Sequence, residues 1–240
     1  DGYNNANNNS GEVFLFTFAD STDKDFTGGT LAAVIGSGYD NTTYGNPRNS
    51  KDKDMSSSLG SGRKDLFGSA VSLDYDSTLE RHRLAVIAKD DEGKNDSRGA
   101  EENSAAYLFT FTDDSFSGAD HVATIGADYD GSKDFDLYID NDDSTGMINS
   151  VSLDGNYLAL GVPNANAPGG GEEVGYVYIF SFTHLTADTQ FTGVTLEGTL
   201  GKTNDPSTTY PTLTVASEGN DLTAGRTITG QTSGATGTVV

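Results

Sequence analysis

Cysteine is absent from this chain. Its absence excludes disulfide bonds, thiolate chemistry and metal sites built on cysteine ligands. The chain also lacks any apolar run as long as a signal peptide or a membrane-spanning helix, so we expect no membrane insertion. Because it begins at Asp1 and not at Met, we expect a processed or truncated piece of something longer.

Basic residues are scarce: 14 Lys and Arg stand against 36 Asp and Glu, which gives a formal net charge of −22. Such a surface repels nucleic-acid phosphates and anionic membranes, so we expect neither as a partner. A cysteine-free acidic chain fits an extracellular or cell-surface setting, a phage or virion surface included. There, salt screens the carboxylates or calcium binds them. Simple solubility is the alternative explanation for the charge.

One apolar and aromatic run occurs three times, as VFLFTF at 13–18, AYLFTF at 106–111 and VYIFSF at 177–182. Aromatic and β-branched residues favour a pleated surface, so each run predicts a strand. Side chains alternate between the two faces of a strand. A strand that is apolar on both faces is typically covered on both sides, so we expect every Phe of these runs in the core.

The first run shows this alternation most simply. Phe14, Phe16 and Phe18 share one face, whereas Val13 and Leu15 share the other. After each run comes a triplet of Phe, a hydroxyl residue and Gly, and then a second predicted strand that ends in Gly. Before the second and third runs lie two more predicted strands, which begin Val-Ser-Leu-Asp and Leu-Ala. A full unit therefore has four short strands.

These repeats divide the chain into two and a half units. We assign 1–36 to the second half of a unit, 37–66 to a polar link, 67–126 to a unit, 127–147 to an acidic link, 148–201 to a unit, and 202–240 to a Thr- and Gly-rich β tail. In the tail, 232–237 predicts a turn between two edge-like strands.

The unit resembles the FG-GAP-like β-propeller repeats, which are related to the integrin α-subunit propeller and are common in large bacterial surface proteins. The matching residues are 66–74 and 84–92 in one unit, and 150–155, 158–163 and 175–182 in the other. The resemblance implies an all-β fold of four-stranded antiparallel propeller-type blades in tandem, a non-enzymatic surface or adhesion role, and calcium in a blade loop. Since propellers close with about 4–8 blades, we expect an incomplete ring or an open array, followed by a small C-terminal β segment.

The candidate metal ligands are Asp128, Asp130, Asp134 and Asp136. The first three stand at relative positions 0, 2 and 6, with Gly131 directly after the second. Alternate residues of a tight loop point inward, which is the spacing that calcium loops use. A solvated acidic loop is the alternative. The resemblance places calcium between the first two strands of a unit, where this chain has only Asp154, Gly155 and Asn156, so that usual site is largely absent.

No catalytic or cofactor-binding residue is assigned besides these candidate calcium ligands. His82, His121 and His184 occupy unrelated positions in the repeat, so we expect them at the surface or at strand ends. No strained nucleophile turn of the Gly-x-Ser-x-Gly type occurs.

The function predicted first is therefore a non-enzymatic, extracellular structural β-repeat protein that self-assembles into a filament, sheath or surface layer, with copies of itself as partners. The half-unit phase and the unpaired strand edges favour this hypothesis. One alternative is a calcium-aided adhesion propeller that binds glycans or surface proteins. A second alternative is an enzyme acting on polysaccharides.

Overall fold

The computed structural model describes residues 10–19, 26–39, 50–59, 65–91, 93–94, 103–137, 147–166, 174–182, 190–201, 227–229 and 236–238. These residues form strands and no helix, so the all-β prediction is confirmed. None of the described segments forms a helix long and apolar enough to cross a membrane. The chain divides into two compact parts, which we call unit 1–205 and unit 206–240 to distinguish them from the repeated units of the sequence.

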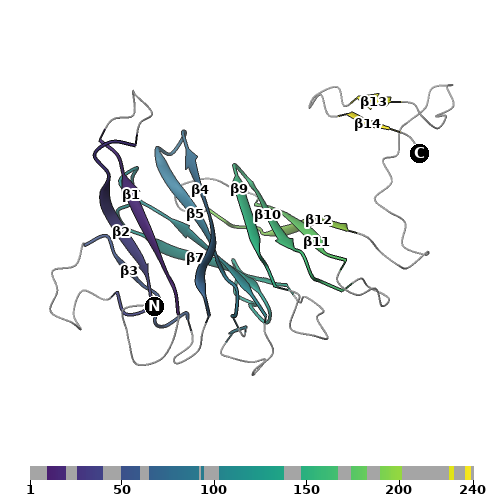
Figure 1. Cartoon of the computed structure of the whole chain (residues 1–240), viewed down its shortest axis with the longest axis horizontal. Helices are drawn as coiled ribbons and strands as arrows, with labels where there is room; N and C mark the ends of the chain where they lie inside the picture. Colours follow the sequence, from purple (N-terminus) through teal and green to yellow (C-terminus); the bar gives the residue numbers. More distant parts are fainter. Residues whose placement is uncertain are drawn as a thin grey trace. The chain divides into compact units, whose positions relative to one another are not determined.

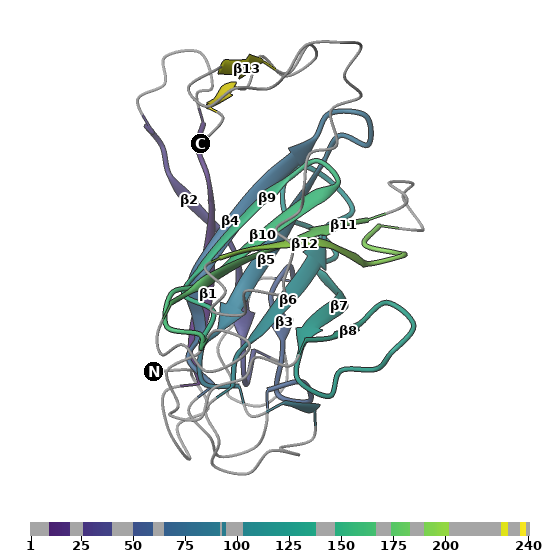
Figure 2. The same ribbon diagram turned by 90° about the vertical axis from the view of Figure 1, so that its right-hand side faces the viewer.

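Unit 1–205 contains three sheets, which Figures 1 and 2 show from two sides. The first sheet contains β1 (Glu12–Thr17), β2 (Thr30–Gly36) and β3 (Lys53–Asp54). The central sheet contains β4 (Phe67–Asp76), β5 (Arg81–Ala88), β6 (Ala105–Thr110), β7 (Asp120–Gly126) and β8 (Phe135–Asp136). The third sheet contains β9 (Ser150–Asp154), β10 (Tyr157–Val162), β11 (Tyr176–Ser181) and β12 (Thr195–Gly201).

Unit 206–240 contributes a two-stranded antiparallel sheet of β13 (Thr227–Thr229) and β14 (Thr236–Thr238). Two strands were expected around a turn at 232–237. Because β14 already begins at Thr236, the last two residues of that predicted turn belong to the strand.

The three sheets share one arrangement of strands. β1, β6 and β11 are the three repeated runs, and each pairs antiparallel with the strand that follows it. In all three pairs the register shifts at the same place, between Leu15 and Phe16, Leu108 and Phe109, or Ile179 and Phe180. A shared bulge of this kind bends each strand alike. The first sheet therefore corresponds to β6, β7 and β8 of the central sheet.

The links at 37–66 and 127–147 each contain a strand that the sequence did not predict. β3 pairs parallel with the end of β2, and β8 pairs parallel with the end of β7. Both are two residues long and carry an Asp-x-Asp sequence with its first Asp just before the strand. The repeated unit thus reaches five strands in the central sheet, not four.

The sheets pack on one another through unlike faces. We call the face that carries Val13 and Leu15, or their counterparts in β6 and β11, the aliphatic face, and the opposite one the aromatic face. The aliphatic face of the first sheet packs against Tyr107, Phe109 and Phe111 on the aromatic face of the central sheet.

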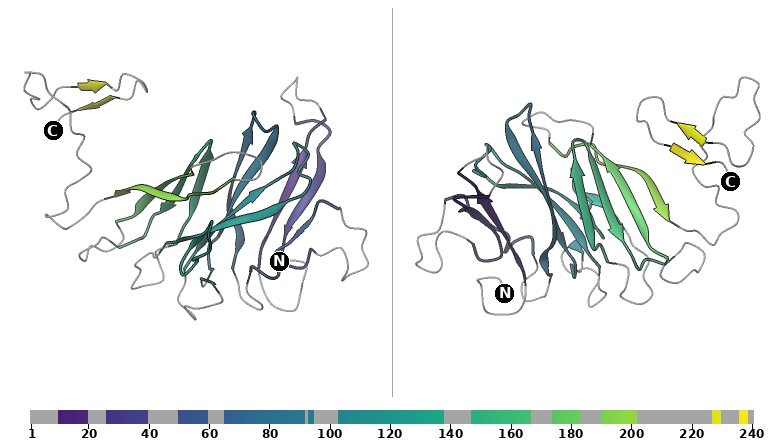
Figure 3. Two further views of the ribbon diagram at one scale, coloured as in Figure 1. Left: turned by 180° about the vertical axis from the view of Figure 1, so that it is seen from behind. Right: turned by 45° about the horizontal axis from the view of Figure 1, so that its top comes forward.

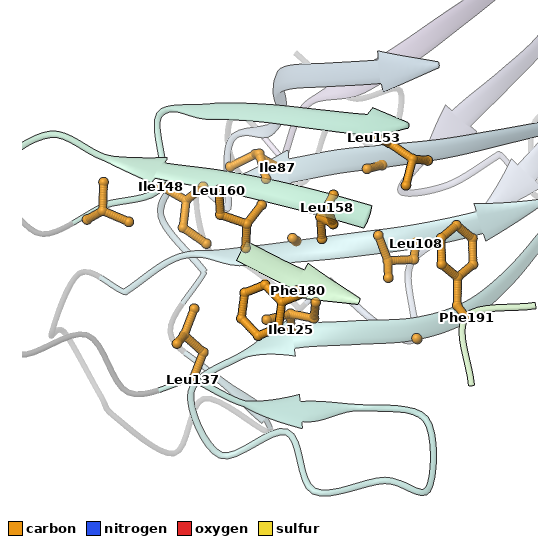
Figure 4. Packing of buried hydrophobic residues seen from close by; sticks show 14 of the residues in the cluster. Ile87, Leu108, Ile125, Leu137, Ile148, Leu153, Leu158, Leu160, Phe180 and Phe191 are labelled. Atoms are coloured by element: carbon orange, nitrogen blue, oxygen red, sulfur yellow. The ribbon is translucent and has the colours of Figure 1, made fainter. Parts of the chain in front are cut away.

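The same contact repeats one sheet further on. Ile87, Leu108 and Ile125 on the aliphatic face of the central sheet pack against Phe180 and the other aromatic-face residues of the third sheet, as Figure 4 shows. The central sheet therefore packs against another sheet on each of its faces, and Figure 3 shows it between the other two.

The triplet of Phe, hydroxyl residue and Gly is a turn with an unusual backbone. Phe26, Phe116 and Phe191 have φ angles of 47°, 64° and 55°. Positive φ is rare for aromatic residues and costs of order 1–3 kcal/mol unless the surroundings enforce it. In each unit the turn returns the Phe ring onto the last Phe of the preceding run. The ring centroids lie 5.1 Å apart for Phe18 and Phe26, 5.2 Å for Phe111 and Phe116, and 4.9 Å for Phe182 and Phe191.

The two ends of this series give a matched stability test. Phe191 is fully buried, so we expect Phe191→Ala to lower the free energy of unfolding by about 3–5 kcal/mol. Phe26 occupies the same place in the first unit but is exposed, so Phe26→Ala should change it by less than about 0.5 kcal/mol. Urea denaturation of the dilute, monomeric chain measures both. Equal losses would contradict the described burial.

Candidate functional site

The aromatic face of the first sheet is open. Phe16 is 49% exposed, whereas its counterpart Phe109 in the central sheet is fully buried. Phe14, Phe18 and Leu31 are similarly exposed. The expectation that every Phe of the repeated runs lies in the core is therefore wrong for the first copy. The alternation of side chains was predicted correctly, but no sheet among the described residues covers this face.

The turn at Phe26 belongs to this open surface. Its ring is 77% exposed, although the backbone holds the same strained conformation as the two buried copies of the turn. Ala19 N donates a 3.2 Å hydrogen bond to Thr27 O, which is the counterpart of the 2.8 Å bond from Thr112 N to Ser117 O. The local hydrogen bond thus fixes the turn in the absence of burial.

The aliphatic face of the third sheet is open as well. Leu200 is 53% exposed, while its counterpart Ile125 is fully buried. Tyr157 and Val177, which lie on the same face of the third sheet, are also exposed. Unit 1–205 therefore ends in two apolar faces of opposite type.

Of the predicted calcium ligands, Asp128, Asp130 and Asp134 lie in the loop between β7 and β8, and Asp136 is the last residue of β8. The carboxylates of Asp130, Asp134 and Asp136 bind other groups of the chain. Asp134 Oδ1 accepts a 2.7 Å hydrogen bond from Thr124 N, and Asp136 Oδ1 accepts a 2.8 Å bond from Asp128 N. Asp130 pairs with the ammonium group of Lys94, which lowers the pKa of Asp130 and raises that of Lys94. Asp128 itself has a positive φ of 62°, which this loop requires at the position that Gly38 fills in the first unit.

The same carboxylates recur in the first unit. Asp52 Oδ1 accepts a 2.8 Å hydrogen bond from Val34 N, and Asp54 Oδ1 accepts a 2.8 Å bond from Gly38 N. The repeated Asp-x-Asp therefore attaches the short parallel strand to the strand before it. The signal was present in the sequence, since Asp52-Lys53-Asp54-Met55 parallels Asp134-Phe135-Asp136-Leu137, but the unequal lengths of the two loops conceal it.

Within the described segments, no three His, Asp or Glu side chains converge in an arrangement able to hold a metal ion. Calcium at Asp128, Asp130, Asp134 and Asp136 remains a hypothesis of the sequence, and the geometry assigns three of these carboxylates to hydrogen bonds within the protein. A second acidic run, Asp90-Asp91-Glu92, is described at Asp90 and Asp91.

Asp91 belongs instead to a buried cluster that the sequence did not reveal. Its carboxylate accepts hydrogen bonds from Tyr107 Oη at 2.6 Å and from Tyr129 Oη at 3.2 Å. Burial, the largest cause, raises the pKa of both tyrosines, and the charge of Asp91 raises it further. Both phenols therefore stay protonated and serve as donors. This cluster ties the loop after β5 to β6 and to the loop after β7.

Two of the three histidines lie in the described part of the chain, near the starts of β5 and β7, as expected for strand ends. The ring of His82 stacks on Phe116 with centroids 4.6 Å apart. His121 Nε2 lies 2.9 Å from Thr124 Oγ1. Desolvation by burial lowers the pKa of both rings, which favours the neutral form. His184 lies outside the described residues.

Asp134 provides a test of the loop's role. We expect Asp134→Ala to destabilise the fold by about 1–3 kcal/mol in the presence of EDTA, because it leaves the Thr124 N–H of β7 without its acceptor. The matched variant Asp130→Ala removes only a solvent-exposed ion pair and should unfold at nearly the wild-type urea concentration. A rise in the melting temperature with calcium for the wild-type chain but for neither variant would favour calcium binding over a purely hydrogen-bonding role of these carboxylates.

The histidines predict a pH dependence. Their folded pKa lies below the usual 6.5, so the unfolded chain binds protons more readily as the pH falls through that value. Stability from these groups is therefore complete above pH 6.5 and declines below it. The double variant His82→Gln/His121→Gln should lose less melting temperature than wild type between pH 7.5 and 5.5. Identical slopes would show that these rings do not carry the effect.

Comparison with protein-family models, with curated proteins and with solved structures finds no match for this chain.

Proposed function

We propose that the chain is a non-enzymatic, extracellular structural protein that self-assembles by adding further sheets to its own stack. Each sheet in this proposal is a propeller-type blade. The third sheet of one copy covers the first sheet of the next, so that the assembly continues the packing seen inside each chain.

The observation that carries the proposal is the pair of open faces. Inside the chain, an aliphatic face always meets an aromatic face, at the contact between the first and central sheets and again at the contact between the central and third sheets. The two faces left open are one of each kind, with Phe16 on the first sheet and Leu200 on the third. They can therefore pair by the rule that already operates twice.

The energetics favour such a contact. Burying one large apolar side chain yields roughly 1.5–3 kcal/mol. The aromatic face exposes Phe14, Phe16, Phe18 and Leu31, and the aliphatic face exposes Tyr157, Val177 and Leu200. Contiguous apolar surfaces of this kind on soluble proteins commonly mark interaction sites. Opposing this gain is the net charge of −22 on every copy, so we expect assembly to strengthen as salt screens the repulsion.

A contact between unlike faces has a direction. Because each copy offers one face of each kind, the interface is heterologous: it makes a ring if the rotation between copies closes and a filament if it does not. The proposal therefore requires that each end of a copy can be blocked separately.

Two capping variants test this requirement. Phe16→Asp blocks the aromatic face and Leu200→Asp blocks the aliphatic face, so each variant alone should sediment as a monomer in analytical ultracentrifugation. An equimolar mixture should form a dimer and nothing larger, because one intact face of each kind remains. Wild type should form larger species at the same concentration.

Ser132→Asp, an exposed loop change of equal charge, is the control and should assemble as wild type does. A wild-type chain that stays monomeric at every concentration and salt tested would refute self-assembly. A mixture that stays monomeric while wild type assembles would refute the pairing of unlike faces.

A further inference from the structure

A third exposed apolar surface lies on the central sheet. Leu73 of β4 is 47% exposed, whereas Leu153, its counterpart in β9, is 5% exposed. Val71 and Tyr75, which flank Leu73 on the same face, are also exposed. Two copies of one strand with the same Val-Ser-Leu-Asp sequence thus differ about ninefold in the exposure of the same leucine. The difference must come from what lies opposite.

Leu153 is covered by the first two strands of the preceding sheet. β9 lies against β4 and β5, and Ser72 Oγ accepts a 2.9 Å hydrogen bond from Leu153 N. Ala85 and Ile87 of β5 belong to the same cluster as Leu153. The cover on Leu153 is therefore a pair of antiparallel strands with small, hydroxyl and aliphatic side chains.

The first sheet lacks this pair among its described strands. It begins at β1, the counterpart of β6. Among the described strands, β1 pairs along its length with β2 alone, on one side. On its other side, the described contact is confined to the start of the strand, where Gly11 bridges to Phe67. The edge of β1 along Val13–Thr17 therefore faces the place that β5 occupies in the central sheet. An edge of this kind is a template for strand addition.

We infer that the edge of β1, together with the exposed stripe of Val71, Leu73 and Tyr75, is an acceptor for an added antiparallel pair of strands of the β9–β10 type. The inner strand of the pair would hydrogen-bond to β1, as β5 does to β6. The outer strand would lie over Leu73 and offer a serine hydroxyl to its backbone N–H, as Ser72 does to Leu153. This surface is separate from the faces proposed to join copies end to end.

The chain itself indicates what the partner looks like. Both of its own pairs carry Val-Ser-Leu-Asp in the outer strand and only small and aliphatic residues in the inner one, at Leu84–Ala88 and Leu158–Val162. Ser152 stands where Ser72 stands, and Ala159 where Ala85 stands. The expected partner is a two-stranded segment with Ser and Ala at these positions, since larger side chains would clash with the stripe.

A synthetic peptide of residues 148–162, which spans β9, its turn and β10, is the probe. We expect it to bind the chain saturably with one peptide per chain, measured by fluorescence polarisation of a labelled peptide. Bound peptide should slow amide hydrogen exchange along β1 and not along β12. The peptide with Ser152→Arg and Ala159→Arg keeps its other face and should bind at least about tenfold more weakly.

Variants of the chain locate the site. Leu73→Asp, and separately Val71→Asp, should weaken binding of the native peptide by about tenfold or more, and both substitute half-exposed residues that the fold tolerates. Leu200→Asp, which blocks end-to-end assembly, should leave peptide binding unchanged. Absence of saturable binding, binding that ignores Leu73→Asp, or protection at an edge other than β1 would overturn the acceptor and leave the self-assembly proposal standing.

Discussion

The fold of residues 1–205 depends on one constraint: each of its three sheets carries apolar side chains on both faces, so each face needs another sheet to exclude water from it. A single four-stranded layer cannot meet this need by itself. Among the described sheets, the central one alone packs against a sheet on each face, the first sheet on its aromatic side and the third on its aliphatic side, although Val71, Leu73 and Tyr75 of β4 stay exposed. The first and third sheets each have one face packed against the central sheet and one face exposed to solvent. The open faces are thus a direct consequence of the composition of the strands.

The packing is directional because the two faces differ in shape. An aromatic face projects large rings such as Phe109 and Phe180, while an aliphatic face presents shorter side chains such as Ala106 and Leu108 between them. Large residues opposite small ones fill the space between layers to the density of a protein interior. Two aromatic faces would leave gaps or clash. This asymmetry turns a repeat in sequence into a stack with a beginning and an end.

Much of this fold could be predicted from the sequence, because β1, β6 and β11 carry a strong strand pattern three times over. The exposure of Phe14 and Phe16 could not, since it depends on which unit stands at the end of the stack and not on the residues themselves. The strands β3 and β8 were missed because two residues carry no periodicity. They are held by carboxylates such as Asp52 and Asp134, which accept backbone hydrogen bonds. From the sequence alone, such a carboxylate cannot be distinguished from a metal ligand.

The turn at Phe26 keeps the geometry of its buried counterparts although no described sheet covers it. Its backbone keeps the strained φ of 47° although its ring gains little burial in return. The hydrogen bond from Ala19 to Thr27 and the edge-on contact with Phe18 hold the turn in the form that its buried counterparts adopt. In the proposed assembly, an arriving sheet would meet rings that already hold the geometry of their buried counterparts, so less conformational entropy would be lost on contact. The turn thus adopts the same backbone form with and without a covering sheet, as the proposed contact between unlike faces requires.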